Sequence, residues 1–304
     1  MDNKIDINAI PKSPRYIYTV EYIFPNPYQS ASAFIKTNDR THFHIQEFYE
    51  ICVISRGKGH HAIENTIVEA KRGDVFIIPP GRRHAILGGD GFDVHYIHLH
   101  PEFIRTYSPR MRLLPAFLSL FEIEPMMRVN GNTYRHLYLD DDVLAEVIKL
   151  IENLVGRWQY DMASKLIFES NMLVILTIFC REYEKMQNKV GINASIDKPF
   201  MDSISYIIEH HGRKITIDEL AKMSTLSRTS YIKRFREVTG KSPNEFITST
   251  RITEAKNMLI GSGKSISKIA EECGFYDASH FTKAFVASVG ESPSEYRARY
   301  ETKK

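Results

Sequence analysis

A near-repeat of about fifty residues limits what the last third of the chain can fold into. The run Gly240-Lys-Ser-Pro-Asn-Glu-Phe246 is echoed by Gly290-Glu-Ser-Pro-Ser-Glu-Tyr296. The residues that recur upstream of these runs are Leu220, Ala221, Tyr231 and Phe235 in the first copy and Ile269, Ala270, Phe281 and Phe285 in the second. The second copy has one extra residue in its turn. This part of the chain is therefore expected to fold as two similar modules.

Each copy carries the signals of two short helices joined by a tight turn. In the first copy, Thr216 and Glu219 form a capping box, in which the threonine hydroxyl accepts a hydrogen bond from a free helix amide and the glutamate reaches back. Ser227 can cap a second helix. Gly240 ends it, because glycine takes the left-handed conformation needed just past a helix. Pro243 then opens a third, longer helix that runs to about residue 260.

The second copy repeats this plan, with a helix from near Ile266, a turn over Cys273–Tyr276 and Asp277 as the next cap. Two short helices joined by a tight turn, the second exposing small polar and basic side chains, form the helix-turn-helix arrangement of many DNA-binding proteins. The alternative is a generic helical bundle, which also has caps and apolar stripes but needs no duplicated unit. The repeat favours two tandem helix-turn-helix units.

The distribution of charge points the same way. Residues 197–304 carry 18 Lys and Arg beside 14 acidic residues, whereas the rest of the chain carries 22 basic and 23 acidic residues. The basic excess lies wholly in the C-terminal third and hints at an anionic partner there.

The first hundred residues instead predict β-structure. Short apolar runs such as Ile51–Ile54 and Val75–Ile78 are bounded by glycine-rich turns. From about Leu113 the apolar period becomes helical, and two amphipathic helices joined at 156–159 suggest an antiparallel hairpin. The segment 188–197 is polar without a strong period, so we expect it to link the two parts.

Many spaced positions of residues 215–300 agree at once with one known pattern. They are Arg251-Ile252, Ala255, Met258-Leu259, Ile269-Ala270, Cys273-Gly274-Phe275, Asp277-Ala-Ser-His-Phe281, Gly290-Glu-Ser-Pro293 and Tyr296-Arg297. On these residues the segment resembles the DNA-binding domain of the AraC family of bacterial transcription activators. The resemblance implies two recognition helices in successive major-groove segments, roughly 34 Å apart, with the long helix between them setting the separation.

The resemblance also implies which side chains contact DNA. The residues implied as base-reading are Thr229, Ser230 and Lys233 in the first unit and Ala278, Ser279, His280, Thr282 and Lys283 in the second. Arg228, Arg234 and Arg236 are better suited to phosphates, which position a protein without reading sequence. Val286 stands where the family often has a basic residue, which puts one phosphate contact in doubt.

The N-terminal part resembles the cupin barrels. The run Gly73-Asp-Val-Phe-Ile-Ile-Pro79-Pro-Gly81-Arg-Arg-His84 matches their second motif, and His42, His44, Glu50 and Gly57 resemble the first, with His44 to Glu50 longer than the pattern by at least one residue. In metal-dependent cupins two His, a Glu and a further His bind the metal, a donor set that suits iron, manganese or zinc. A metal-dependent enzyme and a non-catalytic metal are therefore open alternatives.

The stretched first motif and the fusion to a DNA-binding domain favour a pocket without metal or other cofactor. In that interpretation His42, His44, Glu50 and His84 line a barrel mouth, where a few placed polar groups fix an effector. His84 has a structural alternative, a hydrogen bond to the turn at 79–81. The remaining histidines of this part that we weigh, expected to be exposed or structural, are His95, His98 and His100.

The expected fold class is α+β and multidomain. It comprises a cupin-like sensing barrel over residues 1–105, a helical hairpin over 106–190, a linker over 191–199 and a double helix-turn-helix domain over 200–304. The hairpin helices within 141–187 are expected to form a dimer interface, as the family resemblance implies, although their apolar stripes equally suit internal packing.

The expected function is a sequence-specific DNA-binding transcription regulator that is not an enzyme, and the family resemblance alone implies an activator rather than a repressor. Its expected partners are double-stranded promoter DNA, a small-molecule effector with carbohydrate as the best guess, RNA polymerase and a second copy of the chain. Two rival functions are a metal-dependent cupin enzyme and a DNA-binding protein that responds to no effector.

A cytoplasmic location without membrane contact is expected from three features. No signal peptide is evident in the first thirty residues, and the three cysteines are widely spaced. The most apolar stretch, Met172–Cys180, spans nine residues, far short of a bilayer.

Overall fold

The structure is a computed structural model, which describes residues 16–25, 29–64, 66–125, 136–155, 161–190, 198–261 and 263–301. The chain divides into two compact units, Met1–Ile192 and Asn193–Lys304. The division falls inside the segment 191–199 that the sequence assigns to a linker, of which residues 191–197 lie outside the described residues. The predicted α+β class is confirmed: strands lie in the first unit, and the described part of the second unit is helical.

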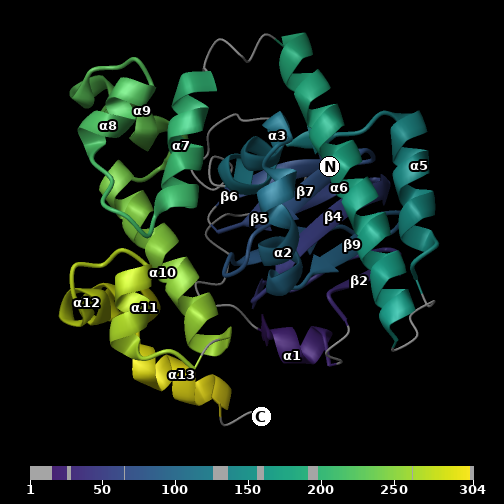
Figure 1. Ribbon diagram of the computed structural model, residues 1–304. Coiled ribbons are helices and arrows are strands. Elements are labelled where there is room, and N and C mark those ends of the chain that lie inside the picture. The colour runs from purple at the N-terminus through teal and green to yellow at the C-terminus, as the bar shows by residue number, and fades with distance from the viewer. Residues whose placement is uncertain are drawn as a thin grey trace. The chain divides into compact units, whose positions relative to one another are not determined.

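Two five-stranded sheets build the N-terminal unit (Figure 1). The first has the order β1 (Tyr16–Tyr18), β3 (His44–Gln46), β8 (His84–Leu87), β5 (Lys58–Ile63) and β6 (Thr66–Lys71). The second has the order β10 (Leu137–Tyr138), β7 (Asp74–Ile78), β4 (Tyr49–Arg56), β9 (Asp93–Leu99) and β2 (Ala31–Lys36). Neighbouring strands are antiparallel except for β1 and β3, and the short helix α1 (Val20–Ile23) follows β1.

Alternation along the strands of the second sheet gives it two different faces. On β4, Cys52 and Ile54 join a cluster that also contains Ala70 and Ile86 of the first sheet, so the two sheets pack face to face. Because successive side chains of a strand point to opposite faces, Ile51 and Val53 point the other way. There they join the large cluster that the helices cover. Glu50 shares the inward face with Cys52, which places its carboxylate between the sheets.

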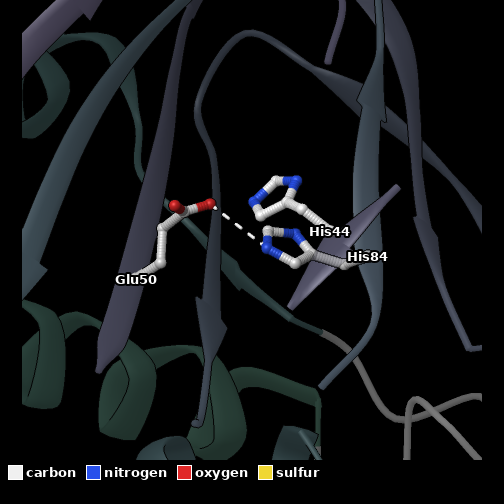
Figure 2. Close-up of side chains that lie close together, drawn as sticks. All are labelled: His44, Glu50 and His84. Carbon is white, nitrogen blue, oxygen red and sulfur yellow. Dashed lines mark ion pairs between the residues drawn. The ribbon is translucent and has the colours of Figure 1, made fainter. Parts of the chain in front are cut away.

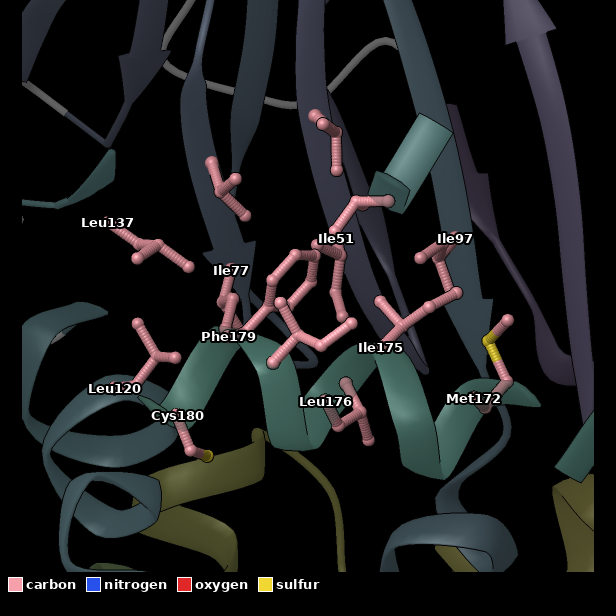
Figure 3. Close-up of a cluster of buried hydrophobic side chains, with 14 of the residues drawn as sticks. Ile51, Ile77, Ile97, Leu120, Leu137, Met172, Ile175, Leu176, Phe179 and Cys180 are labelled. Atoms are coloured by element: carbon pink, nitrogen blue, oxygen red, sulfur yellow. The ribbon is translucent and has the colours of Figure 1, made fainter. Parts of the chain in front are cut away.

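Helices cover the outer face of the second sheet. They are α2 (Pro101–Met111), α3 (Pro115–Leu118), a π-helical turn (Ser119–Ile123), α5 (Asp141–Glu152) and α6 (Met162–Val190). Figure 3 shows α6 lying across the sheet, with Ile175 and Phe179 against Ile51, Ile77 and Ile97. Fully burying one such apolar side chain is worth about 1.5–3 kcal/mol, so helices and sheet stabilise each other.

The predicted barrel and hairpin thus share one hydrophobic core. α2 spans the predicted boundary at residue 105, and the buried stripe of α5, Leu144, Val147 and Ile151, packs in the same cluster as the sheet. The connection predicted at 156–159 lies outside the described residues.

By length and composition alone, one helix among the described residues could cross a membrane: α6 over Met162–Gln187. The nine-residue stretch identified in the sequence understates this apolar length. One side of α6 is nevertheless engaged in the core, and its Glu169 is buried there, accepting hydrogen bonds from Ser30 Oγ and Tyr107 Oη, both at 2.7 Å. These contacts identify α6 as a core helix of the N-terminal unit.

The C-terminal unit consists of seven helices in its described residues. They are α7 (Lys198–His210), α8 (Ile217–Met223), α9 (Arg228–Thr239), α10 (Pro243–Gly261), α11 (Ile266–Glu272), α12 (Ala278–Val289) and α13 (Pro293–Glu301). The N-cap residues are those that the sequence predicts, but Glu219 does not complete the capping box, since its Oε1 accepts from Tyr206 Oη and Arg213 Nη2. Thr216, Ser227 and Asp277 each accept a hydrogen bond from the backbone amide three residues on. Gly240 and Gly290 end α9 and α12 with φ of 71° and 88°.

Candidate nucleic-acid interface and effector site

The second helix of the first helix-turn-helix unit, α9, presents a polar face to solvent. Tyr231 and Phe235 are buried on its inner side. On the other side of the helix, Thr229, Ser230 and Lys233 are all exposed. Helical spacing therefore gathers the three predicted base-reading residues of this unit on the accessible face.

The three arginines assigned to phosphates in this unit lie in different surroundings. Arg228 is exposed at the first turn of α9, where it forms an ion pair with Asp218 at 2.8 Å. The Arg234 guanidinium lies over the Phe200 ring at 5.0 Å, so this side chain is half-buried against α7. Arg236 is exposed near the end of α9.

The corresponding helix of the second unit, α12, buries Phe281 and Phe285 and exposes Ser279, His280 and Lys283. The other two predicted residues are half-buried: Ala278 lies at the start of the helix, and Thr282 donates its hydroxyl to the Ala278 carbonyl at 2.8 Å. The accessible face of α12 thus carries one lysine, one histidine and one serine among the predicted positions.

Within the C-terminal domain, Arg251 on α10 contacts both helix-turn-helix units. Its Nε donates to the His211 carbonyl and its Nη2 to the Arg213 carbonyl, both at 2.8 Å, and its guanidinium lies 5.8 Å from the centre of the Phe275 ring. The turn of the second unit passes close to the same segment, because a Cβ on Gly274 would lie 2.6 Å from the His211 carbonyl oxygen. These contacts hold the two units together, and with them the two recognition helices, α9 and α12, which are called the reading helices below.

The N-terminal unit holds a buried polar cluster between its sheets. Figure 2 shows the His44 and His84 rings next to each other, facing the Glu50 carboxylate from the opposite sheet. His44 and His84 are partners on β3 and β8, and the distance from His84 Nε2 to Glu50 Oε1 is 3.4 Å. Three of the four predicted effector residues therefore meet. The fourth, His42, is exposed outside β3, with its ring 6.2 Å from that of Tyr16.

Three further residues complete this cluster, and the sequence analysis missed them. His98 Nε2 donates to Glu50 Oε2 at 2.9 Å across the β4–β9 pair. Gln46 Oε1 lies 3.1 Å from His84 Nε2, and His61 Nε2 lies 3.3 Å from His84 Nδ1. His98 was expected to be exposed or structural, whereas it is buried and bonded to Glu50.

The other two histidines of this part lie away from the cluster. His95 points to the helix-covered face, with Nε2 3.6 Å from Glu152 Oε1, and burial lowers its pKa. His100 caps α2 by accepting from the Glu102 amide at 3.0 Å. Both histidines therefore lie outside the Glu50 cluster, and the expectation that they are exposed or structural rather than ligands stays a prediction.

The histidines of the cluster stabilise the ionised form of the Glu50 carboxylate. Burial alone raises the pKa of Glu50, but the charge of His84, the hydrogen bond and charge of His98 and the charge of His44 outweigh it and hold the pKa well below its ordinary value. Two polar atoms in the cluster, Gln46 Nε2 and His98 Nδ1, have no hydrogen-bond partner among the residues that the structure describes. Unmatched buried polar atoms of this kind are uncommon in folded proteins, and each calls for a partner such as an ordered water or a bound group.

The chain matches two family models. The AraC-like ligand binding domain matches residues 26–117, and a helix-turn-helix domain matches residues 220–299. The first range contains the whole buried cluster, and the second contains both reading helices.

Two curated proteins resemble the chain over most of its length, and a solved structure resembles its C-terminal part. The HTH-type transcriptional activator RhaS of Escherichia fergusonii is 24% identical over 259 residues, which are 84% of this chain and 86% of that protein. The HTH-type transcriptional activator RhaR of Mannheimia succiniciproducens is 24% identical over 271 residues, 87% of this chain and 92% of that protein. A solved structure, the DNA-binding domain of AdpA in complex with a target DNA, is 28% identical and covers 35% of this chain and 96% of its own, with a TM-score of 0.34.

These matches confirm the family resemblance and a regulator rather than an enzyme. The chain belongs to the AraC family of transcription regulators, and its C-terminal unit binds DNA through a double helix-turn-helix.

Proposed function

We propose that the chain activates transcription when a small polar effector binds between its two sheets. The observation that carries this proposal is the pair of unpartnered buried atoms, Gln46 Nε2 and His98 Nδ1, beside the Glu50 carboxylate. Leaving a buried donor or acceptor unpaired costs about 1–3 kcal/mol. A ligand that pairs both atoms recovers this free energy only in the conformation that holds the cluster together.

A carbohydrate is the effector class that we propose. Its hydroxyl groups both donate and accept, so one ring can pair with an amide, an imidazole and a carboxylate at once. Aromatic rings flank the cluster, with Tyr18 5.0 Å from His44 and Phe48 4.6 Å from His98 between ring centres. Aromatic faces suit the apolar faces of sugar rings.

The residues proposed to contact DNA are those on the exposed faces of the reading helices. Lys233 and Lys283 are proposed to donate to guanine, and Thr229, Ser230, Ser279 and His280 to supplement this reading. Arg228 and Arg236 are proposed for phosphates. Arg234, Ala278 and Thr282 are half-buried, so we propose that they contact DNA only at the edge of the interface.

Effector binding is proposed to shift an equilibrium between arrangements of the two units. Only a ligand with different affinity for the two arrangements can do this. A homodimer is proposed to span paired DNA sites, supported by Leu166, Ile167 and Val174, which are 56, 60 and 48% exposed on α6. As an activator, the protein is proposed to act with RNA polymerase in the cytoplasm.

The test is a thermal-shift screen of simple sugars on the full chain, followed by DNA binding with each sugar that stabilises it. Gln46→Ala is the informative variant, and His42→Ala is the matched control because His42 lies outside the cluster. A stabilising sugar that changes DNA affinity in the parent and the control, but not in Gln46→Ala, supports the proposal. Equal stabilisation of all three proteins contradicts this site.

One observation favours a second occupant. The ligand atoms of His44, Glu50 and His84 all lie within 4.8 Å of one another, and two imidazoles with a carboxylate suit a divalent transition metal. These three residues would hold the ion, which would then organise a ligand as a Lewis acid. Metal analysis of the purified chain beside His84→Ala decides: metal in the parent at one equivalent and none in the variant supports this occupant.

A further inference from the structure

The two helix-turn-helix units differ by one inserted residue, and the structure identifies it. In the first turn the Leu226 amide donates to the Ala221 carbonyl at 2.9 Å, and in the second the Phe275 amide donates to the Ala270 carbonyl at the same distance. The residues just before also correspond, since Thr225 and Gly274 both have positive φ, 54° and 80°. Leu226 and Phe275 are therefore equivalent.

The next equivalent pair is formed by the caps of the reading helices. Ser227 follows Leu226 directly and caps α9, whereas Asp277 caps α12 and is separated from Phe275 by Tyr276. The extra residue of the second unit is therefore Tyr276, directly before the cap of the second reading helix.

Tyr276 has no part in the packing of the domain. Its side chain is 93% exposed, more than any other large hydrophobic side chain among the described residues, and its hydroxyl has no hydrogen-bond partner there. The neighbouring Phe275 is buried with Phe281 and Phe285 and provides the packing of this turn. The fold therefore does not explain why a large aromatic residue occupies this position.

The start of α12 also lacks the cation that begins α9. Arg228 is the first residue of α9, and its equivalent in α12 is Ala278. The free amides at the start of α12 are partly closed to an anion, because the Asp277 carboxylate accepts from the His280 amide at 2.7 Å. One of the amides that could bind a phosphate at this end of the helix is thus taken, and a side-chain donor next to the cap would strengthen such a contact.

We propose that the Tyr276 hydroxyl is that donor and binds a DNA phosphate at the edge of the major-groove segment that α12 enters. Tyrosine is among the side chains that bind phosphate oxygens in protein–DNA complexes, and its ring can lie along the adjacent sugar. The residue before the cap of a reading helix lies at the groove edge, since the first turn of that helix contacts the bases. This proposal rests on DNA binding by the C-terminal unit.

The test compares the full chain with Tyr276→Phe, which removes only the hydroxyl. The probe is DNA from the upstream region of the chain's own gene, with a scrambled duplex as the non-specific probe. We expect about a threefold to tenfold loss of affinity on both probes, the size of one hydrogen bond. The slope of log affinity against log salt is expected to stay unchanged, because no cation is removed.

Tyr276→Lys supplies a donor of different chemistry. It is expected to regain affinity at low salt and to make the salt slope steeper by about 0.9, the effect of one added phosphate contact by a cation. Tyr22→Phe is the matched control, since Tyr22 is 72% exposed in the other unit, and it is expected to bind DNA like the parent.

Three outcomes overturn the inference. Tyr276→Phe with parental affinity removes the role of the hydroxyl, and a loss confined to the specific probe makes Tyr276 a base reader instead. Failure of the parent chain to bind either probe contradicts DNA binding itself, and so distinguishes a failed function from a failed contact.

Discussion

Glu50 on β4 and His98 on β9 are cross-strand partners whose side chains meet between the two sheets, with His98 Nε2 donating to Glu50 Oε2 at 2.9 Å. The sequence predicts Glu50 as an effector residue, but it does not predict His98 as one. Removing one partner of a buried hydrogen bond leaves the other unmatched, which costs about 1–3 kcal/mol.

The depressed pKa of Glu50 gives stability a defined pH dependence. Because its pKa is lower in the folded than in the unfolded chain, its contribution is fully present above the unfolded value, near 4.5. It is lost as the pH falls below that value towards the folded pKa. Thermal unfolding of Glu50→Gln and the parent should therefore differ more at pH 7 than at pH 3. An equal difference at both pH values contradicts the buried, ionised carboxylate.

Because α6 is a core helix, substitutions of its buried residues should destabilise the protein more than substitutions of its exposed residues. Leu176 is fully buried in the cluster that α6 shares with the sheet, so Leu176→Ala should lower the free energy of unfolding by about 2–5 kcal/mol. Val174 is 48% exposed, and Val174→Ala should change it by less than about 0.5 kcal/mol in the monomer. Urea unfolding measures both. Similar losses in the two variants would show that α6 packs on other contacts than those described.

Arg251 is predicted to set the relative position of the two reading helices. Lysine lacks the planar fork that holds two arginine donors in fixed directions, so Arg251→Lys is expected to lose the paired contact with the His211 and Arg213 carbonyls. Affinity for DNA with both sites should fall about tenfold, the effect of roughly 1.4 kcal/mol, with little change for a single site.

Thr253→Ala is the control for this measurement, because Thr253 lies on the same helix and bonds only to the Ser249 carbonyl within it. Competition binding with one-site and two-site duplexes gives both affinities. Equal losses on the two duplexes would falsify the positioning role, since they would indicate general unfolding or a direct phosphate contact.

The sequence predicts local features of the C-terminal unit because they depend on near neighbours. A cap such as Ser227 or Asp277 acts on an amide three residues away, and a buried pair such as Tyr231 and Phe235 follows from helical spacing. The extra residue of the second turn is also visible in the sequence, but its identity as Tyr276 requires the hydrogen bonds that align the two turns.

The effector cluster depends on strand register, which one sequence does not provide. His98 reaches Glu50 because β9 pairs with β4 in a particular register. Its signal was the alternation Val94, Tyr96, His98 on one face of β9, which becomes useful only once that face is known to point inward. His42 lies outside the cluster because β3 begins at His44, two residues further along the chain, and the register of this strand is not evident from the sequence.

DNA binding by the full chain, titrated against salt on duplexes from its own upstream region, tests the central claim most directly. Lys233 and Lys283 lie exposed on α9 and α12. The account predicts sequence-selective binding that weakens steeply with salt, and loss of selectivity in both Lys233→Ala and Lys283→Ala. Equal affinity of the parent for its own and scrambled DNA, unchanged in both variants, would contradict the proposal that α9 and α12 recognise the base sequence.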